Sequence, residues 1–477
     1  MDPSNSILQF LNTIPIPMVV LANLKIIVAG ITTFLALLNH GFDSVMDPIP
    51  LFSPSTNYDF IIVGGGSAGA VVANRLSTNP NFKVLLLEAG GNPTVLNSIP
   101  AMAMSNMRNP YTDWMTRSEP LNTSCLACKD NLITISRGKM LGGSSSLNVM
   151  VYMRGNPNDF DNWANLTGDA SWSYENVLPY FKKSEDYTGN YPDPKYHGTG
   201  GPLSVTAQPD DPLTRDWMSA AREMGFSNSD PNAEFVKQAF VPIDHTMKDG
   251  RRWSTYNAFI QPVLHRRNFK VIRYAHVTKV NFDSTKRAVG VSYIKNGRTF
   301  TATASKEVVL SAGGIGSPHV LMLSGIGHSD HLKSFGRFEY RICRSVHSES
   351  FRYREIVHKL CNVRGGSWAP MISCLCYTCQ TGEGGSRKLR IYGWLLKSEL
   401  QLTKNINYFA HKGPLASNAM TAIGLFSTDQ PPEPNWPNLY AILHPIGIHK
   451  SFGEDFDYFF GFKEGTMKSY CNPYHWC

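Results

Sequence analysis

Residues 58–91, YDFIIVGGGSAGAVVANRLSTNPNFKVLLLEAGG, decide the fold of this 477-residue chain. An apolar run over 58–63 leads into a glycine turn, and an Ala/Val-rich stretch and a second apolar run over 83–87 follow it. This order of strand, turn, helix and strand predicts one βαβ unit of a parallel sheet. Glu88 ends the second strand, as expected of a carboxylate that accepts a hydrogen bond from an adenosine ribose.

The glycine turn has the spacing Gly64-x-Gly66-x-x-Gly69, and each glycine has its own task. Gly64 makes the tight turn, Gly66 lets backbone N–H groups approach a pyrophosphate, and Gly69 lets the helix pack close to the strand. Ser67 and Ala68 begin the helix, where unpaired N–H groups and the helix dipole favour an anion. The stretch therefore predicts a dinucleotide site.

Length and charge exclude some classes of protein. A chain of 477 residues is long enough for two or three domains with a sizeable core. The net charge is +8, but residues 337–397 hold 11 Lys/Arg and 4 Glu, so nearly all of the excess is local. We therefore expect no nucleic-acid partner.

The N-terminal residues 1–40 form a hydrophobic leader, and residues 41–57 form a Pro/Ser/Asn-rich linker. The cleanest run, Ile26–Leu38, has the length of a signal-peptide core and is short for a membrane span. A cleaved signal and a secreted, extracellular protein are predicted. An uncleaved membrane anchor or a buried segment are the alternatives, and only an anchor would imply a membrane partner. Sequons at Asn122 and Asn165 agree with a secreted glycoprotein.

Strand patterns dominate residues 269–310, with Asn296-Gly297 as a predicted hairpin turn. The last of these strands runs into a second glycine-rich turn at Gly313, and a helix is expected from Pro318. Further capped helices are predicted at 171–186 and 216–225.

A second chemically loaded stretch is RGKMLGGSSSLNVMVYMRGNPNDFD, residues 137–161. Its glycine pair, Gly142–Gly143, and the serines that follow let main chain and hydroxyl groups lie against a flat ring system. Asn148 adds an amide that both donates and accepts hydrogen bonds. This stretch resembles the first signature of the glucose–methanol–choline (GMC) flavoprotein oxidoreductases, with matches at Gly138, Lys139, Leu141, Gly142, Gly143, Ser144, Ser145, Leu147, Asn148, Tyr152, Gly155 and Asp161.

The resemblance extends over residues 58–336 and is nearest to the secreted branch found in insects. Residues 313–327, GGIGSPHVLMLSGIG, are similar to the family's second signature. The implied fold class is α/β: a Rossmann-like FAD-binding domain with a second, substrate domain built on an antiparallel sheet. The implied cofactor is FAD, and the residues implied to hold it are Gly64, Gly66, Ser67, Ala68, Gly69, Glu88, Met140, Gly142, Gly143, Asn148 and Val277, with Val277 beside the adenine.

The activity implied by the resemblance is oxidation of a CH–OH group of a small alcohol or sugar. A base takes the hydroxyl proton, hydride passes to the flavin, and oxygen or a quinone accepts the electrons. The cofactor supplies this electron chemistry, while the protein supplies position and electrostatics.

Beyond residue 336 the sequence departs from the family. Residues 337–400 are basic and cysteine-rich, and they show neither the helical nor the strand period of hydrophobic residues. Residues 401–477 resemble a remnant of the substrate domain. The family's His-x-x-Gly-Thr segment, with its catalytic histidine, has no match, and His444 is better interpreted as structural or surface. We therefore assign no catalytic base and expect an incomplete, poorly active form of the enzyme. The alternatives are a non-catalytic flavin-binding or scaffold protein and, less favoured, a nicotinamide-dependent dehydrogenase.

Other conspicuous residues favour structural interpretations. The cluster Cys374-x-Cys376-x-x-Cys379 lacks a clear second pair, so no metal site is predicted. The pair Cys125-x-x-Cys128 is expected to form structural disulfides or remain as thiols. Large aromatic residues are expected to anchor the core, at Trp163, Trp172 and Trp217.

Overall fold

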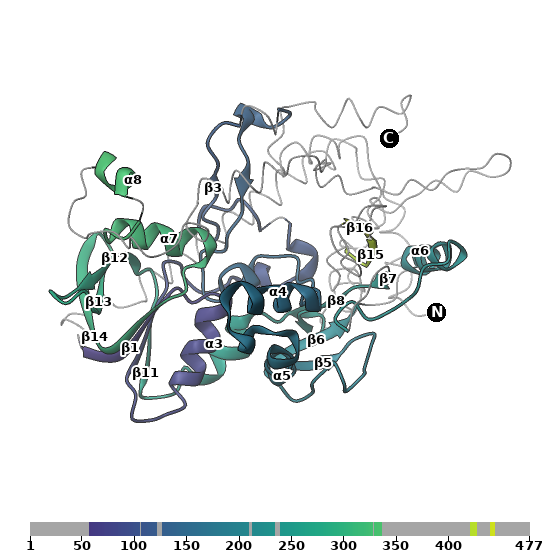
Figure 1. Cartoon of the computed structure of the whole chain (residues 1–477), viewed down its shortest axis with the longest axis horizontal. Helices are drawn as coiled ribbons and strands as arrows, with labels where there is room; N and C mark the ends of the chain where they lie inside the picture. The colour runs from purple at the N-terminus through teal and green to yellow at the C-terminus, as the bar shows by residue number, and fades with distance from the viewer. Residues whose placement is uncertain are drawn as a thin grey trace, which may run out of the picture.

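A computed structural model describes residues 57–335, except 105, 122–125, 209–211, 234–238 and 328, together with 420–426 and 439–443. Figure 1 shows the largest sheet at one end of this part of the chain and the small sheets β5–β6–β8 and β7–β15–β16 toward the other. Helices α3, α4 and α5 lie between them. The predicted residue bounds of the domains stay predictions.

The main sheet has six strands in the order β11-β2-β1-β14-β13-β12. The first four of these strands are parallel, and the last two join them as an antiparallel edge. Their bounds are β1 Asn57–Val63, β2 Val84–Leu87, β11 Phe269–Ile272, β12 His276–Phe282, β13 Ala288–Lys295 and β14 Arg298–Leu310. The predicted parallel βαβ unit is thereby confirmed, and it lies at the centre of the sheet.

Alternate residues of the central strands supply two cores, one on each face of the sheet. Ile61 and Leu85 face a cluster that includes Val320 of α7 (Gly313–Leu323). Ile62 and Leu86 face a second cluster that includes alanines of α3 (Ser67–Leu76). Because every residue of β2 is buried, its sequence VLLL is apolar throughout, as expected of a parallel strand covered on both faces.

The hairpin between β13 and β14 forms as predicted. Asn296 and Gly297 have φ values of 49° and 73°. Two successive residues in this left-handed region are what a type I′ turn requires. The expected start of α7 was wrong, because the helix begins at Gly313 rather than at Pro318. Pro318 lies inside the helix at its sixth position, where its missing N–H leaves the carbonyl of Gly314 without its usual intrahelical partner.

The remaining elements build the second part of the molecule. The three-stranded sheet β7-β15-β16 is antiparallel throughout, which agrees with the predicted fold class. The bounds are α4 Pro157–Thr167, α5 Tyr174–Ser184, α6 Pro212–Glu223, α8 Ser329–Ser334, β3 Thr116–Arg117, β4 Thr134–Ile135, β5 Glu185–Thr188, β6 Leu203–Ala207, β7 Ala239–Pro242, β8 Asp244–His245, β9 Met247–Lys248, β10 Arg251–Arg252, β15 Ala422–Phe426 and β16 Leu439–Leu443.

Two of the three tryptophans predicted to anchor the core lie near the surface instead. Trp163 and Trp172 are each 47% exposed and pack edge-to-face against each other. Trp163 is on α4, whose inward face is taken by Phe160. Trp217 is partly buried against Phe240 of β7. Residue type alone therefore misplaced Trp163 and Trp172.

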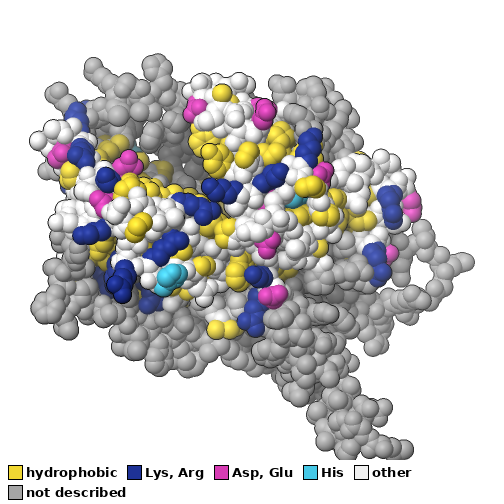
Figure 2. All heavy atoms as spheres, turned by 90° about the horizontal axis from the view of Figure 1, so that it is seen from below, with side chains coloured by type: hydrophobic (Ala, Val, Ile, Leu, Met, Phe, Trp, Pro, Cys, Tyr) yellow, Lys and Arg dark blue, Asp and Glu magenta, His cyan; other side chains and the backbone are white. Residues whose placement is uncertain are grey.

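Charged side chains are dispersed over the surface that Figure 2 shows. Lys and Arg side chains lie scattered among acidic residues, with hydrophobic patches between them. Among the described residues, no helix combines the length and hydrophobicity needed to cross a membrane. The predicted leader, residues 1–40, lies outside the described residues.

Candidate cofactor site

The glycine turn after β1 brings the start of α3 against the sheet. Gly64 has a φ of +95°, and a Cβ there would lie 2.6 Å from the carbonyl oxygen of Ser311. A Cβ on Gly69 would lie 2.0 Å from the carbonyl oxygen of Gly64, so only glycine allows this approach of helix to strand. Helix α3 begins without a side-chain cap or an acidic residue in its first turn. Its first amide groups therefore suit a bound anion.

Glu88 lies at the carboxyl end of β2 and is 5% exposed. Its carboxylate accepts the backbone N–H of Gly65 at 2.8 Å and that of Gly90 at 2.9 Å. Burial raises the pKa of Glu88 although these amide groups favour the ionised form. An ionised carboxylate has about four lone-pair sites, so these backbone bonds leave acceptor capacity for a ribose hydroxyl group. The predicted ribose contact is thus chemically compatible with the bonds that hold the turn.

The two glycine segments predicted to bind the cofactor meet in space. The N–H of Gly142 donates to the carbonyl oxygen of Gly65 at 2.8 Å. A Cβ on Gly143 would lie 2.7 Å from the Cα atom of Gly66, and both Gly142 and Gly143 have positive φ. Because Gly66 and Gly143 have no side chains, the backbone of Gly143 lies directly against the residue that precedes α3. The sequence motifs, more than 70 residues apart, therefore form one cradle.

Three further predicted residues differ in what they could offer a cofactor. Met140 is fully buried and Val277 is 5% exposed, packed in the core beside the main sheet. A side chain with no exposed surface cannot touch a cofactor, so Met140 could contribute only backbone atoms, whereas Val277 is as exposed as Glu88. Asn148 is exposed. It follows the short 3-10 turn η4, Gly143–Ser146, and can present its side chain.

A charged residue that the sequence analysis missed lies behind this cradle. Arg252 of β10 is 3% exposed and donates to the carbonyl oxygen of Ser145 at 3.1 Å and to Oδ1 of Asn148 at 2.9 Å. Burial lowers the pKa of Arg252 to about 9. The sequence RRW around it carries no signal that separates the buried arginine from the exposed Arg251 before it.

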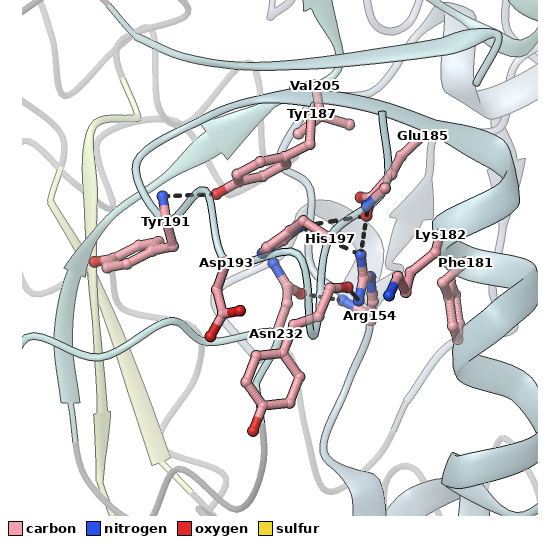
Figure 3. A network of polar contacts seen from close by, with 12 residues as sticks. Arg154, Phe181, Lys182, Glu185, Tyr187, Tyr191, Asp193, His197, Val205 and Asn232 are labelled. Atoms are coloured by element: carbon pink, nitrogen blue, oxygen red, sulfur yellow. Dashed lines mark hydrogen bonds and ion pairs between the residues drawn. The ribbon is translucent and has the colours of Figure 1, made fainter. Parts of the chain in front are cut away.

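A second polar cluster is buried away from the glycine turn, among α5, β5 and the loops beside them (Figure 3). Arg154 and Glu185 form an ion pair, and His197 contacts Glu185 at 3.3 Å and Asp230 at 2.9 Å. Arg154 also donates to the carbonyl oxygen of Tyr196 at 2.7 Å. The sequence analysis did not predict this network.

Several predicted features lie outside the described residues. These are the basic segment 337–400, most of 401–477, His444, Cys125 and the cluster Cys374–Cys379. Cys128 is described and is buried. Within the described part of the chain, no group of His, Cys, Asp or Glu side chains is arranged to hold a metal ion.

Fold and site together define a class: a dinucleotide-binding α/β protein with a glycine-rich cradle and a second, partly antiparallel region. Comparison with known proteins gives the family. Residues 58–351 match the family model of the GMC oxidoreductase N-terminal domain. The chain belongs to the GMC oxidoreductase family, which confirms the family predicted from the sequence.

Individual relatives are similar to this chain over a comparable length. The chain is 41% identical over 284 residues to an oxygen-dependent choline dehydrogenase of Staphylococcus saprophyticus, covering 59% of this chain and 50% of the relative. It is 42% identical over 284 residues to the glucose dehydrogenase [FAD, quinone] of Drosophila melanogaster, covering 59% and 45%. The chain spans about half the length of the curated relatives it matches.

Among solved structures, pyridoxine 4-oxidase from Mesorbium loti superposes with a TM-score of 0.54 at 32% identity, covering 59% of this chain and 54% of that one. The predicted fold class is confirmed by this likeness and by the sheets described above. FAD, the predicted cofactor, is confirmed as the cofactor of the family.

Proposed function

We propose that this chain binds FAD in the cradle formed by Gly64–Gly69, Glu88 and Gly142–Asn148. The observation that carries the proposal is the junction of Gly66 with Gly143, where a Cβ on Gly143 would lie 2.7 Å from the Cα atom of Gly66, so that no side chain separates the two glycine segments. The buried carboxylate of Glu88 supports a ribose at one end of the cradle, and the uncapped start of α3 supports the phosphates.

The reaction that we propose is oxidation of a CH–OH group in a small alcohol or sugar, with oxygen or a quinone as the electron acceptor. Bound FAD supplies the electron chemistry. The chain's own residues bind it, orient it and set the charge around it. The relatives are named for choline, glucose and pyridoxine, which supports a small hydroxylated substrate. No catalytic base is assigned among the described residues.

Secretion remains part of the proposal. Asn165 of the sequon Asn165-Leu-Thr167 is exposed on α4, which suits a glycan acceptor. Enzymatic removal of N-glycans from the protein expressed in insect cells should lower the apparent mass of the protein. An unchanged mass in the wild type would contradict the glycoprotein proposal.

Binding of FAD is tested by two glycine variants that carry the same backbone strain. Both Gly143→Ala and Gly200→Ala place an L-residue at positive φ, at a cost of about 1–2 kcal/mol. Only Gly143→Ala also inserts a methyl group against Gly66, because Gly200 has open space around it. We expect Gly143→Ala to weaken FAD binding by about tenfold or more, and Gly200→Ala to leave it unchanged. Flavin fluorescence titration measures both.

Three outcomes separate the alternatives. Failure of the wild-type chain to bind FAD would refute the proposal. Equal binding by wild type and Gly143→Ala would place the cofactor elsewhere. If flavin binds but no alcohol or sugar bleaches its visible absorbance, the chain is a non-catalytic flavin-binding protein and not an enzyme.

A further inference from the structure

Arg252 is a buried cation without a carboxylate partner among the described residues. It is 3% exposed, and its hydrogen bonds go to neutral acceptors: the carbonyl oxygens of Asn97 at 2.7 Å and Ser145 at 3.1 Å, and Oδ1 of Asn148 at 2.9 Å. A buried, unpaired charge is costly for a folded protein. A protein can keep such an unpaired charge where the charge stabilises a bound ligand of opposite sign.

Two donor atoms next to this charge have no acceptor in the described part of the chain. They are Nη2 of Arg252 and Nδ2 of Asn97, which is 1% exposed. Leaving a buried donor unsatisfied costs about 1–3 kcal/mol, and more for a charged group. The two residues contact each other, so the acceptors of the described residues leave the positive charge at this one place incompletely offset.

Hydrogen bonds fix the orientation of Asn148 toward the outside. Its Oδ1 accepts both the guanidinium N–H of Arg252 at 2.9 Å and the backbone N–H of Met150 at 3.0 Å. Only the oxygen of the amide can accept two donors, so the NH₂ group is left for the exposed side of the residue. Asn148 therefore presents a donor to the cradle while a buried cation lies behind it.

The place of this donor follows from the order of groups along a dinucleotide. Glu88 suits the adenosine ribose and the start of α3 suits the phosphates. The ring system of FAD is attached beyond the phosphates. Turn η4 leaves the phosphate end of the cradle, and Ser145 and Asn148 lie along this same segment. We therefore assign Asn148, five residues beyond Gly143, to the ring system of the cofactor rather than to the phosphates.

We propose that Arg252 is a positioning residue that orients Asn148 and supplies the buried positive charge favouring reduced, negatively charged FAD over oxidised FAD. The proposal rests on the proposed function. It concerns the charge balance of the bound cofactor and requires no further reactant.

The test compares three ligands rather than activity. Arg252→Met removes the charge, and Arg251→Met removes the exposed arginine beside it in β10 as the matched control. Each variant is titrated with ADP, oxidised FAD and, without oxygen, reduced FAD. We expect Arg252→Met to bind ADP as the wild type does, to lose a few-fold for oxidised FAD and to lose about tenfold or more for reduced FAD. Arg252→Lys should recover part of the loss, and Arg251→Met should change none of the three.

Asn148→Asp keeps the test decisive if Arg252→Met does not fold. A carboxylate at this exposed position would pair with Arg252 and neutralise it, so reduced FAD should again lose most. Asn81→Asp, at an exposed site after α3, is its control. Equal losses for ADP and both forms of FAD would make Arg252 a structural residue and overturn the inference, as would unchanged binding of reduced FAD by Asn148→Asp. Failure of the wild type to bind any FAD would instead refute the proposed function and this inference together.

Discussion

At the scale of single residues, the molecule places charge in its interior in two different ways. Arg154 is buried with a carboxylate, Glu185, against it. His197 joins the same group through Glu185 and also contacts Asp230. Arg252 has only neutral acceptors among the described residues. The first arrangement holds chain segments together, whereas the second leaves a buried charge that no carboxylate of the described residues neutralises.

His197 gives the paired cluster a defined pH dependence. Burial alone would lower the pKa of His197, but its hydrogen bonds to Asp230 and Glu185 outweigh burial and raise the pKa above its ordinary value. A raised folded-state pKa means that charged His197 stabilises the fold fully below the unfolded-state pKa of about 6.5. That stabilisation is lost as pH rises through the folded-state value.

Replacement of His197 by Gln should therefore destabilise the protein most in mild acid. We expect a loss of about 1.5–3 kcal/mol near pH 5.5, from hydrogen bonds to charged groups, and a smaller loss near pH 8.5. Urea unfolding of wild type and variant at both pH values measures the difference. His265→Gln, on an exposed loop residue, is the control. A loss that is the same at both pH values would show that His197 acts only as a neutral packing residue.

At the scale of elements, one serine ties α7 to the edge of the main sheet. Oγ of Ser324 accepts the backbone N–H of Val280 in β12 at 2.8 Å and donates to the carbonyl oxygen of Val320 at the preceding turn of α7. Ser324 is 1% exposed, so water cannot take over either bond. The two bonds fix the position of the C-terminal end of α7 against β12.

Ser324→Ala is expected to cost about 1–3 kcal/mol, because it leaves the N–H of Val280 buried without an acceptor. Thermal unfolding monitored by circular dichroism measures the loss. Ser334→Ala removes an exposed hydroxyl that donates to His331 and should leave the melting temperature unchanged. Similar melting temperatures for wild type and Ser324→Ala would mean that packing of α7, not this bond, holds the joint.

At the scale of the whole molecule, binding at the cradle should stabilise the main sheet against unfolding, because strands β1 and β2 end at the cradle. A ligand that binds only the folded chain stabilises it by about 2.7 kcal/mol at a concentration one hundred times its dissociation constant. The melting temperature should therefore rise steadily with FAD concentration. ADP should give a smaller rise, since it lacks the ring system. A melting temperature independent of FAD would argue against a site attached to this sheet.

The sequence predicted the centre of the fold well and its periphery less well. The βαβ unit, the Asn296-Gly297 hairpin and the two glycine segments follow from local patterns, and the structure has them. The network around His197 could not be predicted, because its partners lie 12 or more residues away along the chain. Arg252 was missed for a different reason. Burial distinguishes it from Arg251, and the sequence around the two residues does not show burial.

The bonds among Glu88, Gly65 and Gly142 have a consequence for the manner of association. Each is made within the chain, so the cradle is preformed and little backbone has to be ordered when a cofactor arrives. Association with such a site carries a small conformational entropy cost. It should proceed in a single kinetic phase whose rate rises linearly with cofactor concentration, without the plateau that a slow rearrangement would impose.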